Sequence, residues 1–198
     1  MALKLASIFF TMILVDNYVL AKFLGICPFL GVSKKLDSAV GMSLAVTFVM
    51  VMATAATWPL YMGILAPNGL EYLQTIVFIL VIAILVQLLE NFLKKFIPAL
   101  YKSLGVYLPL ITTNCTILGV TILNLDNGYS FPESIVCAAG AGIGFLVAMV
   151  LFSGVRRKVE QAIVPECFKG LPITLVAAAM TSLSFMGFGG IVEAIFGV

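Results

Sequence analysis

Histidine is absent from this sequence, and charged residues are scarce. Only 10% of the 198 residues are charged, where about a quarter is usual for a soluble domain. Without histidine the chain lacks the commonest general base and the commonest nitrogen ligand for metals. This absence excludes a Ser-His-Asp hydrolase, a His-ligated haem and a Rieske cluster. The net charge of +2 is too small to suggest a nucleic-acid partner.

Hydrophobic residues are correspondingly abundant. They make up 62% of the chain, and the mean hydropathy is +1.18. These values predict an all-α, polytopic membrane protein, because a helix needs about 20 apolar residues to cross a bilayer. Six stretches are expected to span the membrane: Leu5–Leu30, Ala39–Leu65, Leu70–Leu93, Leu100–Leu125, Pro132–Val155 and Leu171–Phe196. No segment is left for a soluble domain, so residues 1–198 are expected to form one integral membrane domain.

The basic residues between these stretches predict the orientation. They lie in three alternate connections: Lys34 and Lys35; Lys94, Lys95 and Lys102; and Arg156, Arg157, Lys158 and Lys169. The other two connections, residues 66–69 and 126–131, contain no Lys or Arg. By the positive-inside rule the three basic connections face the cytoplasm, which places both termini outside a cytoplasmic (inner) membrane. Only Lys4 argues weakly against this orientation.

A ten-residue segment occurs twice in altered form, as FLGICPFLGV at Phe23–Val32 and ITTNCTILGV at Ile111–Val120. Both copies contain Cys-x-x-Leu-Gly-Val, beginning at Cys27 and at Cys115. The simplest explanation is a duplication, with halves of roughly 1–95 and 96–198. Three spans per half is an odd number, so the halves would have opposite orientations. The sequence therefore predicts an inverted 3+3 repeat.

Residues that disfavour helices surround both cysteines. They are Gly25, Pro28 and Gly31 near Cys27, and Pro109, Asn114 and Gly119 near Cys115. We therefore expect the first and fourth helices to be broken. An interrupted helix survives inside a membrane only where protein or a cavity covers its free backbone groups. Two interruptions at corresponding positions predict a site between the halves.

Two thiols at matched depth suggest metal or redox chemistry. A thiolate is a soft ligand suited to iron–sulfur clusters, which require four protein ligands. Cys27 and Cys115 would supply two, so a partner or a second copy would supply the others. Backbone amides freed near Pro28 and the side chains of Thr112, Thr113 and Asn114 could donate hydrogen bonds to cluster sulfurs and tune the potential. No residue is expected to be catalytic in its own right.

Other interpretations stay open at this point. A buried cysteine is ordinarily a small hydrophobic residue, and the two thiols could instead form a disulfide, although a cytoplasm-facing environment disfavours one. Inverted repeats with broken helices also characterise secondary transporters, so an ion or solute carrier is the alternative function. A third interpretation is a scaffold subunit with inert cysteines. A carrier or a scaffold would tolerate replacement of both cysteines by serine.

Two other features have separate interpretations. Asp16 and Lys22 lie within the first predicted span, where a charge is costly enough to suggest a role in ion movement. Alternatively, Asp16 lies near the outer interface and Lys22 extends its amine to it. Gly140 and Gly144 form a GxxxG spacing, which predicts close helix packing rather than a nucleotide loop.

Three segments carry a family resemblance. They are NYVLAKFLGICPFLGVSKK at Asn17–Lys35, LPLITTNCTILGV at Leu108–Val120 and SFMGFGG at Ser184–Gly190. They resemble the A-subunit family of the Rnf complex, within a larger family that includes the sodium-pumping NADH:quinone oxidoreductase, Nqr. The resemblance covers essentially the whole chain. The Cys-Pro-Phe segment followed by Val-Ser-Lys-Lys favours Rnf over Nqr.

The resemblance implies a function. In that family two homologous six-helix subunits of opposite orientation pair in the membrane, and each contributes two cysteines to one shared [2Fe-2S] cluster. Cys27 and Cys115 match those ligand positions. The complex transfers electrons between reduced ferredoxin and NAD, coupled to translocation of Na⁺ or H⁺, and its other subunits carry flavin and iron–sulfur centres. The isolated chain is expected to have no activity, and Cys137 and Cys167 lie outside the motif.

Overall fold

The computed structural model describes residues 2–33, 36–96, 108–162 and 164–187, and these residues contain helices but no strand. The all-α prediction is confirmed for them. The α-helices are α1 (Ala2–Leu14), α2 (Ile26–Val32), α3 (Leu36–Leu60), α4 (Gln74–Phe96), α6 (Leu108–Thr112), α7 (Cys115–Asp126), α8 (Phe131–Gln161) and α9 (Leu171–Met186). A π-helical turn, Tyr61–Leu65, extends α3, and 3-10 turns lie at Glu71–Leu73 and Glu166–Phe168.

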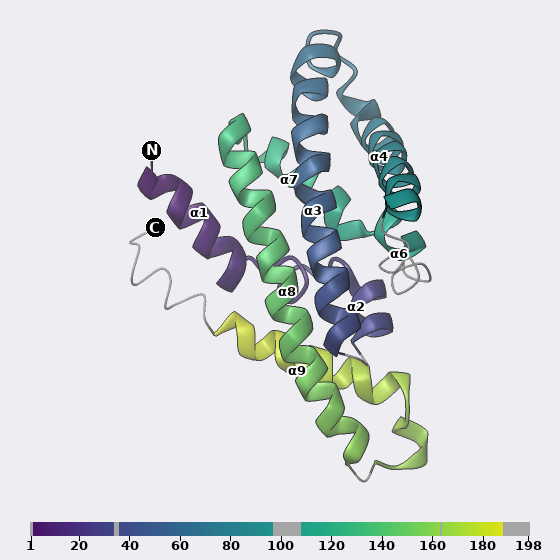
Figure 1. Ribbon diagram of the computed structural model, residues 1–198. Helices are drawn as coiled ribbons and strands as arrows, with labels where there is room; N and C mark the ends of the chain where they lie inside the picture. Colours follow the sequence, from purple (N-terminus) through teal and green to yellow (C-terminus); the bar gives the residue numbers. More distant parts are fainter. Residues whose placement is uncertain (1, 34–35, 97–107, 163, 188–198) are drawn as a thin grey trace.

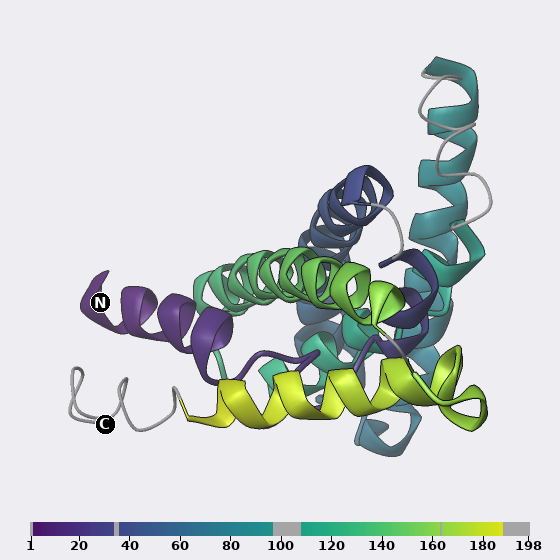
Figure 2. The ribbon, with the colours of Figure 1, turned by 90° about the horizontal axis from the view of Figure 1, so that it is seen from below.

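The two long helices α3 and α8 form the centre of the molecule (Figure 1). Helix α1 packs on α8 at one side, and α4 packs on α3 at the other. Helix α9 packs on α8, which it crosses at a steep angle in Figure 1; seen from below, it lies to one side of α8 (Figure 2). Among the short helices, α2 and α7 contact α3, α6 contacts α2 and α4, and α7 also contacts α4 and α8. Segments from the two halves of the sequence are therefore interleaved.

Three of the six predicted spans correspond to helices long and apolar enough to cross a membrane: Leu36–Leu65, Gln74–Phe92 and Phe131–Gln161. The other three predicted spans fall on shorter apolar helices, Lys4–Leu14, Leu110–Asp126 and Leu171–Met186. Parts of the fourth and sixth predicted spans, residues 100–107 and 188–196, lie outside the described residues. The inverted six-helix repeat therefore stays a prediction.

One expected loop is helical instead. The sequence predicts that Arg156, Arg157 and Lys158 lie in a connection after the fifth span, but α8 continues through all three to Gln161. The guanidinium of Arg156 donates a hydrogen bond to the carbonyl of Leu30 at the end of α2 and one of 2.8 Å to Ser33 Oγ. It also pairs with Glu160 at 3.4 Å. These partners allow a charged side chain to pack inside the protein, so the helix does not end at the first arginine.

The GxxxG prediction is confirmed. A Cβ atom added at Gly140 would lie 3.1 Å from the Phe9 carbonyl oxygen, and one added at Gly144 would lie 3.0 Å from the Met12 carbonyl oxygen. Helix α1 therefore approaches α8 along both glycines, closely enough for backbone contact. Small residues permit this approach, which is how membrane helices gain packing energy without a hydrophobic driving force between them.

A third glycine of α8, Gly142, fixes the distance between the two central helices. A Cβ atom there would lie 2.4 Å from Cγ2 and 2.7 Å from Oγ1 of Thr47 on α3. Thr47 Oγ1 in turn donates a 2.7 Å hydrogen bond to the Ser43 carbonyl, which limits its freedom to move away. The α3–α8 contact therefore depends on the absence of a side chain at position 142.

We expect Gly142→Ala to destabilise the protein by about 1–3 kcal/mol, the usual cost of overpacking. Gly154→Ala on the same helix is the matched control, because nothing lies within 4 Å of a Cβ atom there. That control should gain about 0.5–1 kcal/mol from helix propensity alone. Thermal unfolding of both variants in detergent measures the difference. Equal stability of the two variants would show that Thr47 does not constrain this crossing.

Candidate functional site

The first broken helix is interrupted between Val15 and Gly25, where a series of turns joins α1 to α2. The turns are held by backbone hydrogen bonds such as Ala21 N–H to the Asn17 carbonyl, 2.8 Å, and Leu24 N–H to the Tyr18 carbonyl, 2.8 Å. The interruption ends at Gly25, whose φ of 80° lies in the left-handed region and favours glycine.

The side chain of Asn17 organises this interruption from inside. It is 1% exposed. Its Nδ2 donates a 2.8 Å hydrogen bond to the Gly144 carbonyl of α8, and its Oδ1 accepts from the N–H groups of Val19 and Leu20 at 3.0 and 3.4 Å. One buried amide therefore fixes the turns to the central helix and satisfies backbone donors that a membrane could not solvate.

The second broken helix is interrupted at Thr113 and Asn114, between α6 and α7. Asn114 is the N-cap of α7 and has an extended backbone, with φ −73° and ψ 112°. Its Oδ1 accepts a 3.0 Å hydrogen bond from Thr116 N–H, which satisfies one of the donors left free at a helix start. Asparagine is among the preferred residues at this position, so the sequence itself determines where α7 begins.

The predicted causes of the two interruptions are partly wrong. Of the six residues expected to break helices, only Gly25 and Asn114 lie at an interruption. Pro28 and Gly31 lie inside α2, and Pro109 and Gly119 lie inside α6 and α7. Pro28 and Pro109 fall in the first turn of their helices, where the missing N–H would have had no helical partner. The two glycines are tolerated in the interior because helix propensity is a weak preference.

The structure brings the two copies of the repeated motif together. Gly25 N–H donates a 2.9 Å hydrogen bond to Cys115 Sγ. The preceding side chain, Leu24, lies over Gly119, where an added Cβ atom would be 2.6 Å from Leu24 Cδ1. The end of the first interruption, Leu24 and Gly25, therefore packs directly on the first turns of α7. Gly25 precedes Cys27 by two residues. Both cysteines lie in the first turn of the helix that follows an interruption.

Both motif cysteines are exposed on the surface of this chain, although Pro28 and Phe29 after Cys27, and Asn114 and Thr116 beside Cys115, are buried. Among the described residues, no group of three or more His, Cys, Asp or Glu side chains could bind a metal ion. The two exposed thiols would supply half of the four ligands that a cluster needs, and a partner would have to supply the others. An iron–sulfur cluster is therefore compatible with these residues only at an interface.

Two buried polar atoms next to the cysteines have no hydrogen-bond partner: Asn114 Nδ2 and Thr116 Oγ1. Buried polar groups are nearly always paired, so each such atom needs an explanation. Both belong to residues that flank Cys115, and Thr116 Oγ1 faces the Gly25 backbone, where an added Cβ atom would lie 2.2 Å from it. They are donors available to a sulfur-rich group at this surface.

Thr112, Thr113 and Asn114, the three residues predicted to assist a cluster, line a pocket of about 360 Å³ with Cys115 and Leu118. Its opposite wall is formed by Ile79, Ile82 and Ala83 of α4. The predicted residues therefore do lie beside Cys115. Within this group Asn114 has a defined structural role as the cap of α7, while Thr112 and Thr113 contribute to the wall of the pocket.

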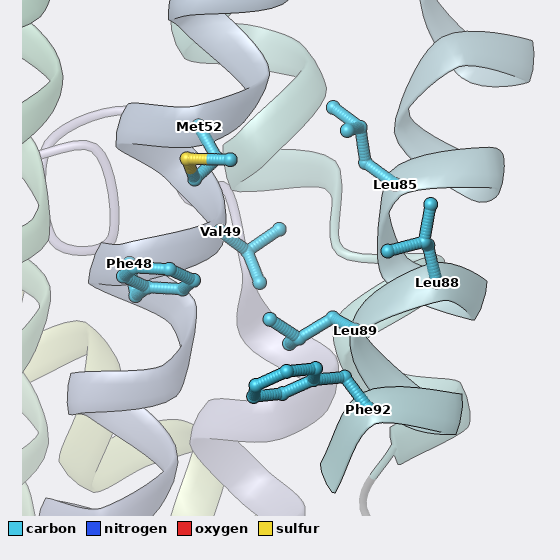
Figure 3. A pocket seen from close by; sticks show the side chains of 7 residues that line it. All are labelled: Phe48, Val49, Met52, Leu85, Leu88, Leu89 and Phe92. Carbon is cyan, nitrogen blue, oxygen red and sulfur yellow. The ribbon is translucent and has the colours of Figure 1, made fainter.

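A second hollow lies between α3 and α4, and Figure 3 shows apolar side chains from both helices pointing into it. Its volume is about 130 Å³, and it is lined by Phe48, Val49, Met52, Leu85, Leu88, Leu89 and Phe92. No side chain in that lining carries nitrogen or oxygen. It suits hydrocarbon, such as a lipid chain, and does not compete with the cysteine surface as a candidate site.

The remaining charges and cysteines are placed as follows. Asp16 and Lys22 both lie in the first interruption, and Lys22 Nζ lies 5.1 Å from the centre of the Tyr18 ring, within the range of a cation–π contact. Cys137 is 0% exposed within α8, as expected for a packing residue. Cys167 is exposed in the 3-10 turn before α9. Neither cysteine joins the motif pair.

Sequence reasoning missed three residues that act on the motif. Gly25 was singled out only as a helix breaker, yet its amide contacts Cys115. Thr116 was not singled out, although it follows Cys115 and is 0% exposed. Arg156 was assigned to a loop, yet it binds the end of α2, the helix that contains Cys27. These contacts join residues far apart in sequence, and no local pattern could have indicated them.

Comparison with known proteins gives a consistent result. Residues 5–192 match the family described as Rnf-Nqr subunit, membrane protein. The A subunit of an ion-translocating oxidoreductase complex from Syntrophotalea carbinolica is 55% identical over 180 residues, covering 91% of this chain and 93% of the relative. The A subunit of the Na⁺-translocating ferredoxin:NAD⁺ oxidoreductase complex of Acetobacterium woodii is 53% identical over 188 residues, covering 95% and 98%. The A subunit of an ion-translocating oxidoreductase complex from Aliivibrio salmonicida is 51% identical over 181 residues, covering 91% and 94%. This chain belongs to the Rnf-Nqr family of membrane subunits.

Proposed function

We propose that this chain is an electron-transfer subunit of a redox-driven ion pump, in which Cys27 and Cys115 hold one half of a [2Fe-2S] cluster shared with a homologous membrane subunit. The names of the relatives support the coarser part of this function, a subunit of an ion-translocating ferredoxin:NAD⁺ oxidoreductase complex. The finer part, the ligand role of the two cysteines, is supported by their geometry.

The observation that carries the proposal is the contact between the two motif copies. Gly25 N–H reaches Cys115 Sγ at 2.9 Å, and Cys27 follows Gly25 by two residues at the start of α2. Two exposed thiols in one region, each in the first turn of a helix, form a surface that a partner can complete. When bound there, a [2Fe-2S] cluster would supply one-electron transfer.

The chain's own residues would then perform three tasks. Cys27 and Cys115 would bind iron as thiolates. The unpartnered Asn114 Nδ2 and Thr116 Oγ1 would donate to sulfur, with Thr112 and Thr113 beside them, since hydrogen bonds to cluster sulfurs tune the potential. The apolar walls formed by α4, including Ile79 and Ile82, would keep water away from the site.

Contacts between the two halves support the proposed inverted repeat. Arg156 of α8 donates to the Leu30 carbonyl at the end of α2. In the other half, Trp58 Nε1 of α3 donates a 3.1 Å hydrogen bond to the Tyr129 carbonyl, just beyond α7. Each long helix therefore supports the broken helix of the opposite half, a reciprocity expected of a pseudo-two-fold arrangement. We infer one integral domain in the cytoplasmic membrane, with both termini outward and a partner subunit of opposite orientation.

The carrier alternative makes a different prediction, and the relatives' names do not favour it. Purified complex containing this chain should be placed in sealed proteoliposomes, and uptake of Na⁺ and H⁺ should be followed. We expect uptake to begin only when reduced ferredoxin and NAD⁺ are both supplied. A carrier would move ions down an imposed gradient without either reactant, and that result would refute the proposal. Which of the two ions moves then follows from the same assay.

A further inference from the structure

We propose that Gly25 is a positioning residue whose backbone amide holds the Cys115 thiolate and raises the reduction potential of the site; this inference rests on the ligand role proposed above. It concerns a residue outside the Cys-x-x-Leu-Gly-Val motif. The contact is one hydrogen bond, from Gly25 N–H to Cys115 Sγ at 2.9 Å. It joins the two halves of the chain at the ligand itself.

The structure leaves no room for another residue at this position. Gly25 is buried, with a φ of 80° that L side chains rarely adopt. A Cβ atom would lie 2.2 Å from Thr116 Oγ1, 3.2 Å from Phe145 Cε2 and 3.3 Å from Asn114 Oδ1. Any side chain would therefore push the amide away from Cys115. The close packing is what brings the N–H group within reach of sulfur.

The location of the amide determines its effect. Reduction of an iron–sulfur site adds negative charge, part of which falls on the ligand sulfurs. A donor aimed at one of them favours the reduced state and raises the potential. Hydrogen bonds to charged acceptors are stronger than those to neutral ones, and it is the difference in strength between the two oxidation states that shifts the potential. We expect this difference to change the one-electron equilibrium about tenfold, which corresponds to about 59 mV. Cys115 is exposed in this chain, and a partner subunit that covers it would exclude bulk water, which strengthens the effect of the bond.

The test measures the midpoint potential by potentiometry and the nitrogen couplings by pulsed EPR, both on the intact complex. Both are read from the EPR component that is present in the wild type and absent from Cys27→Ser. Cells are grown with ¹⁵N-glycine, so that the Gly25 nitrogen is labelled. The wild-type component should show a hyperfine coupling to ¹⁵N from a hydrogen-bonded peptide nitrogen. Absence of any such coupling in the wild type would overturn the proposal without the need for a variant.

Substitutions then assign the coupling. Gly25→Ala should lower the midpoint potential by the amount given above. Thr116→Ala removes the atom nearest the added Cβ, so the double variant Gly25→Ala/Thr116→Ala should recover most of the potential of Thr116→Ala alone. The same double variant should lose the ¹⁵N coupling, since residue 25 is no longer glycine. A double variant that recovers the midpoint potential but loses the ¹⁵N coupling would show that the amide of residue 25 is the donor.

Gly69→Ala is the matched control for backbone strain. Gly69 also has a positive φ, 65°, but nothing lies within 4 Å of a Cβ atom there, and the potential of this variant should not change. An unchanged potential in Gly25→Ala with the spectral component intact would overturn the proposal. So would retention of the glycine coupling in the double variant. If Cys27→Ser removes no spectral component, the ligand role fails first, and that result is distinct from a failure at Gly25.

Discussion

Cys27→Ser and Cys115→Ser are each expected to reduce ferredoxin:NAD⁺ electron transfer by more than about a hundredfold in the assembled complex. Changes to groups around metal ligands typically cost about 10–100-fold, and loss of a ligand itself should exceed that range. A serine hydroxyl is a poor substitute, because iron–sulfur sites require soft thiolates. Each variant is assayed in inverted membrane vesicles, with complex content determined by immunoblot.

The matched control is Cys167→Ser. Cys167 is exposed like the motif cysteines but lies in the 3-10 turn before α9, so its replacement should leave electron transfer unchanged. A complex that assembles and keeps full electron transfer with serine at position 27 or 115 would contradict the ligand role. It would then favour a scaffold function, in which the thiols only pack. Loss of electron transfer in Cys167→Ser but not in the two motif variants would show that Cys167, rather than Cys27 and Cys115, is needed for electron transfer.

The second large effect is expected at Asn17. Replacement by leucine preserves the approximate volume but leaves the buried N–H groups of Val19 and Leu20 without their acceptor and removes the bond to Gly144. Each unsatisfied buried group costs about 1–3 kcal/mol, so Asn17→Leu should destabilise the protein by about 3–5 kcal/mol. The corresponding fall in melting temperature is about 10 °C. Heating followed by fluorescence-detected size-exclusion chromatography measures it.

Asn68→Leu is the control for this substitution. Asn68 also donates through Nδ2 to a backbone carbonyl, that of Ile64 at 2.7 Å, but it is exposed, so water can replace the lost partner. Its melting temperature should change by no more than a few degrees. Equal losses for Asn17→Leu and Asn68→Leu would show that the first interruption is not held by its buried amide.

The sequence was most informative where the cause of structure is local. Apolar length predicted the helical class and the three long spans, because backbone groups in a membrane must bond within their own helix. The Gly140 and Gly144 spacing predicted close packing, and the structure shows α1 against both. Two interruptions near the repeated cysteines were also expected, and both are present.

The sequence was less informative where several local signals compete. Pro28 and Gly31 were expected to interrupt a helix that in fact contains both residues, because a proline in the first turn loses no helical bond. The positive charge of Arg156 predicts a loop, but the residue lies within α8. Its side chain is accommodated by acceptors at Leu30 and Ser33, more than a hundred residues earlier in the chain. The contact of Gly25 with Cys115 is made by a backbone amide, which every residue except proline has, so the residue type does not indicate it. Tertiary contacts of this kind are not encoded in any short segment.

The most direct measurement is the iron and acid-labile sulfide content of the complex purified through this subunit, with an EPR spectrum after dithionite reduction. Wild type is compared with Cys27→Ser, Cys115→Ser and the control Cys167→Ser. Since other subunits can contain clusters of their own, the informative quantity is the difference between samples. The account predicts that each motif variant loses one [2Fe-2S] equivalent and the same spectral component, while Cys167→Ser loses neither. Unchanged iron, sulfide and spectrum in the two motif variants would contradict it.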